Sequence, residues 1–219
     1  MAGLFIVLEG GEGCGKSTIA DYLFKRLSSN GYRVLLTREP GGVKISEQIR
    51  NIILDNNNKE MDPMTEALLY AASRRQHLIE KVIPELESNG IVICDRFIDS
   101  SLAYQGYARG LGIDNIMKLN SFAIQDPKSS NKYFPDLSIF LDIDPIKGLD
   151  RVKSRGEKLN RLDKEKLGFH YLVREGYNKI IQTNNYIIKI DASEELSVVE
   201  EKVYNKVLEL ITSKGLQIN

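Results

Sequence analysis

Cysteine and histidine are scarce in this chain, and tryptophan is absent. Its 219 residues include two cysteines and two histidines. Cys14 lies in a glycine-rich stretch and Cys94 ends an apolar run, which does not suit a disulfide framework. We therefore expect reduced thiols and a cytoplasmic protein. His77 and His170 fall within predicted helices, where we expect structural roles and no general base.

The chain also lacks an excess of charge of either sign and any long apolar run. Lysine plus arginine and aspartate plus glutamate each number 30, which argues against a dedicated surface for nucleic acid or anionic membrane. No apolar run approaches the roughly 18 residues of a membrane span, and residues 1–8 lack a signal-peptide layout. We expect neither nucleic acid nor a membrane as partner. The length predicts one domain over residues 1–219.

Apolar runs alternate with helix-length segments along the chain. The predicted strands are Leu4–Leu8, Arg33–Thr37, Ile91–Cys94, Leu137–Leu141 and Tyr186–Ile190. The predicted helices are Ser17–Asn30, Lys44–Leu54, Thr65–Ser88, Ile113–Gln125, Ile146–Arg155, Asp163–Asn184 and Glu194–Lys214. This alternation predicts an α/β fold, a five-stranded parallel sheet with helices on both faces.

The stretch GGEGCGKST after the first strand predicts a phosphate-binding P-loop. Gly10, Gly15, Lys16 and Ser17 satisfy the pattern G-x-x-x-x-G-K-[ST] between a predicted strand and a predicted helix, the context that this pattern requires. Backbone N–H groups and the N-terminal end of the helix would cradle phosphates. Lys16 would reach the β- and γ-phosphates, and the Ser17 hydroxyl would ligate Mg²⁺. We therefore expect a P-loop NTPase or kinase architecture.

Two arginines follow other strands of the predicted sheet. Ligands bind at the carboxyl ends of parallel strands, and Arg38 and Arg96 stand there after the second and third strands. They leave room for a second anion opposite the nucleotide. The chain has neither the D-x-x-G nor the N-K-x-D sequence of a GTPase, and Arg96 follows Asp95 where a motor ATPase has a water-activating glutamate. A nucleotide kinase fits better, because a phosphate acceptor is already nucleophilic and needs positioning more than a base.

Seven stretches in order along the chain resemble the bacterial thymidylate kinase family. They are LEGGEGCGKST at 8–18, TREPGG at 37–42, LLYAASR at 68–74, CDRFIDSSLAYQG at 94–106, PDLSIFLD at 135–142, RGEKLNRLD at 155–163 and FHYLVREGY at 169–177. The resemblance implies phosphorylation of dTMP to dTDP with ATP and Mg²⁺, and a homodimer. Two alternatives remain open: a P-loop kinase for another nucleoside or nucleotide, and a regulatory P-loop NTPase.

The resemblance also implies roles for individual residues. The ATP-binding set is Gly10, Gly11, Glu12, Gly13, Cys14, Gly15, Lys16, Ser17 and Thr18. The substrate-binding set is Glu12, Arg38, Tyr70, Arg74, Arg96, Ser101, Tyr104 and Gln105. Within it, Glu12 would accept a hydrogen bond from the deoxyribose 3′-hydroxyl, Arg38 and Arg96 would hold the acceptor phosphate, and Tyr104 would disfavour a ribose 2′-hydroxyl.

Two side chains of one helix would contact the base, and one carboxylate would assist the metal ion. Tyr70 would stack on the thymine ring where the family usually has phenylalanine, and Arg74, one helical turn later, would reach the base edge. Asp95 would lie near Mg²⁺ beside Ser17, through water.

A basic segment at about 151–163 is the candidate lid over ATP. It contains Arg151, Lys153, Arg155, Lys158 and Arg161 around Gly156. The plain alternative is a charged, solvated face. Since the P-loop has no basic residue besides Lys16, the resemblance favours a lid cation at the transferring phosphoryl group, Arg155 first and Arg161 second. The expected catalytic set is Lys16, Arg96, Arg155 and Arg161.

Overall fold

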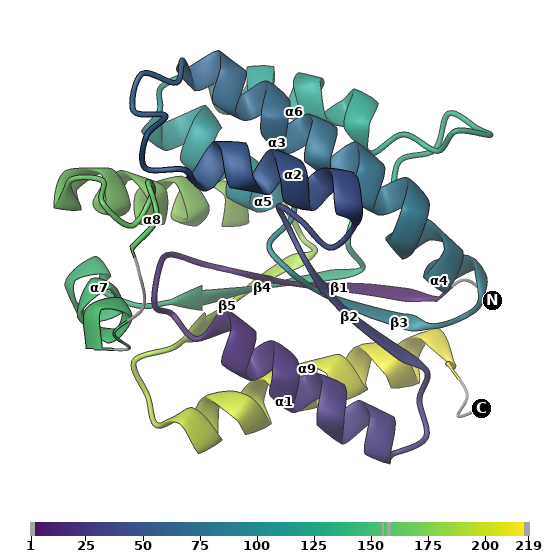
Figure 1. Ribbon diagram of the computed structural model, residues 1–219. Helices are drawn as coiled ribbons and strands as arrows, with labels where there is room; N and C mark the ends of the chain where they lie inside the picture. The colour runs from purple at the N-terminus through teal and green to yellow at the C-terminus, as the bar shows by residue number, and fades with distance from the viewer. Residues whose placement is uncertain (1–2, 155, 157–158, 217–219) are drawn as a thin grey trace.

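A five-stranded parallel sheet forms the centre of the molecule (Figure 1). The computed structural model describes residues 3–154, 156 and 159–216. The strands lie in the order β2-β3-β1-β4-β5. Their bounds are Leu4–Glu9 (β1), Val34–Arg38 (β2), Ile91–Asp95 (β3), Leu137–Asp142 (β4) and Ile187–Asp191 (β5). Every neighbouring pair is parallel, so the predicted fold class is confirmed.

Helices cover both faces of this sheet, as Figure 1 shows. One face carries α1 (Lys16–Ser29) and α9 (Leu196–Lys214). The other carries α2 (Lys44–Leu54), α3 (Pro63–His77), η1 (Leu78–Val82), α4 (Ile83–Glu87), α5 (Ile98–Ser101), η2 (Leu102–Ala108), α6 (Ile113–Ala123) and α8 (Leu167–Ile181). Helix α7 (Pro145–Ser154) lies beyond the carboxyl edge of the strands.

Alternate residues of each strand feed two separate hydrophobic cores. In β1, Leu4, Ile6 and Leu8 belong to the core under α1 and α9. Phe5 and Val7 belong to the core under α3, α6 and α8. Successive side chains of a strand point to opposite faces, so a strand buried on both faces reads as a continuous apolar run. This explains why LFIVLE shows no polar alternation.

The helix predicted at Thr65–Ser88 is not one regular helix. It is interrupted by the π-helical segment η1, in which the Ile83 N–H donates to the Leu78 carbonyl, five residues back. Pro84 follows at once. Proline lacks an N–H and its ring crowds the preceding turn, which accounts for the widened turn there.

Residues 98–108 are helical although no helix was predicted there. The short helix α5 leads directly into the π-helical segment η2. The stretch contains Ser100, Ser101 and Gly106, weak helix formers on local propensity, and it is buried along most of its length. Tertiary packing therefore overrides propensity here. The predicted helix Asp163–Asn184 begins later, at Leu167.

The carboxyl edge of the sheet gathers the residues that follow β1, β2 and β3. Strand register places Asp95 level with both Leu8 and Arg38. The P-loop, Arg38 and Arg96 therefore emerge together. Both cysteines are buried and free. None of the helices in the described part of the chain is long and apolar enough to cross a membrane.

Candidate active site

The P-loop joins β1 to α1 as the sequence motif requires. Gly15 has a φ of 97° at the start of α1, a backbone conformation that glycine adopts without steric cost. The Lys16 ammonium donates to the carbonyls of Gly10 (3.2 Å) and Gly11 (2.9 Å). Gly13 lies so close to α7 that a Cβ there would stand 2.0 Å from the Gly148 carbonyl oxygen. The loop backbone is therefore held against α7.

Ser17 and Asp95 lie side by side at the mouth of the loop. The Ser17 hydroxyl donates to Asp95 Oδ2 at 2.8 Å. A hydroxyl and a carboxylate are oxygen ligands of the kind that Mg²⁺ takes, so this pair fits that ion. Among the described residues, no group of three histidine, cysteine or acidic side chains could hold a metal.

A polar cleft of about 450 Å³ opens in front of the P-loop; we call it the phosphate cleft. It is lined by Glu12, Gly13, Gly15, Lys16, Ser17, Arg38, Glu39, Arg50, Asp95, Arg96, Val152, Asn160 and Asp163. Arg38 and Arg96 stand here as expected. Arg50 was missed: it lies on α2 and donates to the Pro40 carbonyl at 2.8 Å. In the sequence, Arg50 is marked only by its position, two turns into the helix that follows TREPGG.

Arg96 is held by several partners. Its φ of 72° lies in the left-handed region, uncommon for a residue with a side chain. Its guanidinium donates to the Gly10 carbonyl (2.9 Å), the Ser100 hydroxyl (3.1 Å) and Glu12 Oε1 (2.8 Å). The Tyr104 ring lies 5.0 Å from it, in cation–π range. A strained backbone of this kind persists where several contacts hold the residue in place, as they do here.

Glu12 is ionised despite its burial in the P-loop. Burial alone would raise its pKa, but the charges of Arg96 and Lys16 and the Tyr104 hydroxyl lower it to about 2. In turn, burial opposes the charge of Arg96, but the surrounding groups together, Glu12 first among them, raise the arginine pKa. Both groups therefore keep their charges at neutral pH, as a site that binds a phosphate and a hydroxyl needs.

Glu9 holds the loop that carries Arg96, and sequence reasoning missed it. This fully buried carboxylate accepts from the backbone N–H groups of Phe97 (2.8 Å) and Ser100 (3.2 Å). It also accepts from the Ser100 and Tyr177 hydroxyls. Burial raises the pKa of Glu9, although the hydroxyl partners lower it in part. The sequence contained one usable signal, a glutamate that ends an otherwise apolar strand.

A much smaller pocket, of about 20 Å³, adjoins the phosphate cleft; we call it the acceptor pocket. It is lined by Tyr70, Arg96, Ser100, Ser101, Tyr104, Gln105 and Leu162. Five residues of the expected substrate-binding set thus meet in one cavity. The Tyr104 hydroxyl donates to Glu12 Oε1 at 2.8 Å, which links the pocket to the P-loop. Leu162 closes the pocket from the C-terminal part of the candidate lid.

Arg74 lies behind this pocket and does not line it. Its side chain is 1% exposed. Its guanidinium donates to Glu39 (2.8 Å), Ser101 (3.1 Å), the Phe97 carbonyl (2.9 Å) and Asn120. These bonds occupy four of its five N–H groups, so at most one is left for a base edge. His77, expected to be structural, donates from Nδ1 to Glu39 (2.9 Å), and its Nε2 shares a hydrogen bond with the Thr37 hydroxyl (2.7 Å) in the same buried network.

The described part of the lid does not bring Arg161 into the phosphate cleft. Arg161 donates to the Glu66 carboxylate and, at 2.9 Å, to the Ile53 carbonyl. Arg151 donates to the Ala192 carbonyl at 3.2 Å. Arg155, the first candidate for the transferring phosphoryl group, lies outside the described residues. Val152, Asn160 and Asp163 are the lid residues that line the cleft.

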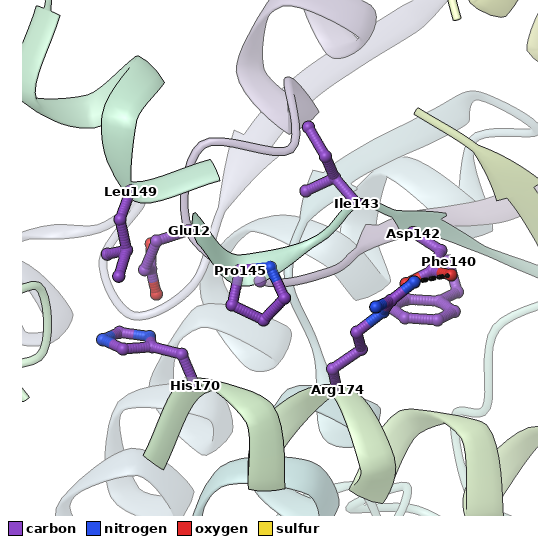
Figure 2. Close-up of a pocket in the computed structure, with 9 residues that line it drawn as sticks. Glu12, Phe140, Asp142, Ile143, Pro145, Leu149, His170 and Arg174 are labelled. Atoms are coloured by element: carbon purple, nitrogen blue, oxygen red, sulfur yellow. Dashed lines mark hydrogen bonds and ion pairs between the residues drawn. The ribbon is translucent and has the colours of Figure 1, made fainter. Parts of the chain in front are cut away.

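A small cavity lies behind the P-loop, between β4, α7 and α8. Figure 2 shows the His170 ring facing Glu12 across it, while Arg174 bonds to Asp142 on its other side (2.6 Å). His170 is 5% exposed, and its Nε2 has no hydrogen-bond partner among the described residues. Burial lowers the pKa of His170, and the Glu12 charge opposes this. The ring is thus a neutral polar group beside the P-loop.

Comparisons with known proteins agree with this geometry. The family model described as thymidylate kinase matches residues 8–203. A thymidylate kinase of Oceanobacillus iheyensis is 53% identical over 215 residues, 97% of this chain and 91% of that protein. One of Clostridium novyi is 55% identical over 203 residues, covering 92% and 96%. The crystal structure of thymidylate kinase from Ehrlichia chaffeensis has a TM-score of 0.73 at 32% identity and covers 95% of this chain and 99% of its own.

Proposed function

Because the chain belongs to the thymidylate kinase family, we propose that it transfers the γ-phosphoryl group of ATP to the phosphate of dTMP and releases dTDP and ADP. One observation carries the proposal at the level of the site. Arg96 lines both the phosphate cleft and the acceptor pocket. A monophosphate whose base enters the pocket therefore has its phosphate beside Arg96, facing the P-loop.

These residues contribute to the reaction by positioning the two phosphates and by neutralising their charge. The acceptor phosphate oxygen attacks the γ-phosphorus, the bond to the β-phosphate oxygen breaks, and ADP departs. Lys16 binds the β- and γ-phosphates, and Arg38, Arg50 and Arg96 hold the acceptor phosphate by charge-assisted hydrogen bonds. No residue has to remove a proton, because a phosphate monoester is already anionic at neutral pH.

Glu12 is the natural partner of the deoxyribose. Its Oε1 is occupied by Arg96 and Tyr104, so Oε2 is the oxygen that accepts from the 3′-hydroxyl. Mg²⁺ would be held by Ser17 directly and by Asp95 through water. When ATP is bound, this ion would neutralise part of the phosphate charge.

The chain forms one domain in this proposal, and residues 151–163 act as its lid. Arg161 bonds to Glu66 and to the end of α2, which supports a role in holding the C-terminal end of the lid in place. Arg155 is therefore the first choice for the cation that meets the transferring phosphoryl group. Closure of this segment would exclude water and limit idle hydrolysis of ATP.

ADP formation with different acceptors tests the proposal. The enzyme is given ATP and Mg²⁺ with dTMP, dUMP, UMP, CMP, AMP or no acceptor. We expect dTMP to give the fastest rate by a wide margin. If another monophosphate gave the fastest rate, the protein would still be a kinase, but the acceptor pocket would bind a different base. Equal ADP formation without any acceptor would reject the kinase proposal in favour of a regulatory NTPase.

A further inference from the structure

Gln105 presents a fixed hydrogen-bonding pattern to the acceptor pocket. It lies on η2, lines the pocket and is 2% exposed. Its Nε2 donates to Glu66 Oε1 at 2.8 Å. A carboxylate can only accept hydrogen bonds, so the amide NH₂ has to face Glu66. The amide carbonyl oxygen is thereby turned away from Glu66, and no described residue donates to it.

Glu66 cannot rotate away from this contact. It is 1% exposed. Arg109 donates to both of its oxygens (3.4 and 3.3 Å), and Arg161 donates to Oε2. Burial opposes the charge of Glu66, but these arginines and Gln105 outweigh burial and lower its pKa. An ionised carboxylate clamped by two cations keeps its remaining acceptor position directed at Gln105.

An acceptor atom in the pocket distinguishes between pyrimidines. Thymine and uracil carry a hydrogen on N3, which donates to such an oxygen. Cytosine and 5-methylcytosine have a bare N3, whose lone pair would face the amide oxygen and be repelled. The methyl group is common to thymine and 5-methylcytosine, so the amide orientation, and not pocket size, separates these two bases.

We propose that Glu66 is the positioning residue for base selection: by fixing the amide of Gln105, it makes the pocket accept thymine and reject cytosine. Glu66 itself does not line the pocket, so it acts through Gln105. This inference rests on the proposed function and deepens it. It places the origin of base selectivity outside the set of residues that contact the base.

The variant Glu66→Gln tests the inference with dTMP and 5-methyl-dCMP as acceptors. Arg109 and Arg161 offer only donors, so they attract the carbonyl oxygen of the new amide and its NH₂ faces Gln105. Gln105 then turns its own carbonyl toward position 66 and its NH₂ toward the base. We expect the ratio of kcat/KM for dTMP to that for 5-methyl-dCMP to fall by about 100-fold or more, since a site built for one hydrogen-bonding pattern rejects the other strongly.

The control variant is Glu165→Gln. Glu165 is the other carboxylate partner of Arg109, at 2.6 Å, and it does not contact Gln105. We expect it to leave the acceptor ratio unchanged. The exchange variant Glu66→Gln/Gln105→Glu keeps one buried charge and again presents only acceptor atoms to the base. We expect it to restore the preference for dTMP, and it carries the test if Glu66→Gln does not fold.

Three results separate the possibilities. An equal loss of kcat/KM for both acceptors in folded Glu66→Gln would overturn the inference, because a purely structural role affects both alike. An exchange variant that prefers 5-methyl-dCMP would overturn it as well. Failure of the wild-type enzyme to phosphorylate dTMP would instead reject the proposed function, and it would be seen before any variant is made.

Discussion

At the residue scale, Arg96 and Glu12 form the centre of the candidate site. They are joined at 2.8 Å, and both are mostly buried. Removing one partner of such a pair leaves the other as an uncompensated buried charge. The acceptor phosphate and the 3′-hydroxyl would meet this same pair from two sides. A change at either residue should therefore affect the acceptor far more than ATP.

We expect Arg96→Ala to lower kcat/KM for dTMP by roughly 1,000-fold, within the range for loss of a buried charged partner. ATP should still bind, because the P-loop and Lys16 are intact. Steady-state kinetics and ATP titration measure the two effects. Arg33→Ala is the matched control, since Arg33 pairs with Glu85 and its side chain is 52% exposed. Wild-type turnover in Arg96→Ala would contradict the role.

A second residue-scale prediction concerns pH and stability. Asp99 is fully buried and accepts from the Ser138 (2.8 Å) and Tyr186 (2.9 Å) hydroxyls. Burial and the nearby Glu9 raise its pKa from 3.8 to about 7. The folded chain then binds more protons than the unfolded chain between these two values, so this carboxyl contributes less stability as pH rises through that window.

Asp99→Asn removes this titration. We expect the free energy of unfolding of the variant minus that of wild type to increase as pH rises from about 4 to about 7, because wild type loses stability over this range, and to level off above it. Urea unfolding of both proteins across this range measures the difference. A difference that stays constant with pH would show that Asp99 titrates as it does in water.

At the element scale, α7 supports the P-loop through backbone contact. A Cβ at Gly148 would lie 2.3 Å from the Glu12 carbonyl oxygen. Neither backbone can give way without moving the loop, and overpacking of this kind costs about 1–3 kcal/mol. The approach of the two elements thus depends on glycine on both sides, Gly13 and Gly148.

We expect Gly148→Ala to displace the P-loop, raise KM for ATP by about 10-fold or more, and lower the melting temperature. Gly168→Ala is the matched control in α8, because a Cβ there meets nothing within 4 Å. ATP kinetics and thermal melts of both variants measure the effects. Equal behaviour of the two variants would argue against the contact.

A comparison of the helices and strands also shows which of them local sequence patterns are enough to predict. Strands β1, β3 and β4 and helices α1 and α9 follow from apolar periodicity, since each of them buries a regular stripe or run. The π-helical segments and the helix after β3 do not. Pro84 distorts a turn that periodicity reads as regular, and η2 is helical because its residues are packed against α8 and α6.

At the scale of the whole molecule, the exposed apolar side chains suggest a covered face. Five of them lie on α2, α3 and α6, the layer on one side of the sheet in Figure 1: Ile45, Ile52, Met64, Leu68 and Phe122. Phe122 is 77% exposed. We expect these side chains to lie in the interface of the homodimer that the family resemblance implies, since an apolar interface would remove them from water.

We expect light scattering on a sizing column to give twice the chain mass of 24.8 kDa. Leu68→Glu on α3 should return the protein to monomer by placing a charge in the interface. Leu196→Glu, on α9 across the sheet, is a control of equal exposure (51% against 50%) and should stay dimeric. A monomeric wild type would exclude this assembly.

The sequence by itself determined the sheet, the P-loop and the two arginines at the carboxyl ends of β2 and β3. These features depend on neighbours in the chain: apolar runs, glycine spacing and the residue after each strand. The tertiary structure decided which polar groups meet. Glu9 holds the loop of Phe97, and Glu66 faces Gln105 and Arg161, at separations of 88, 39 and 95 residues. Such pairings arise from the packing of whole elements, and no local periodicity records them.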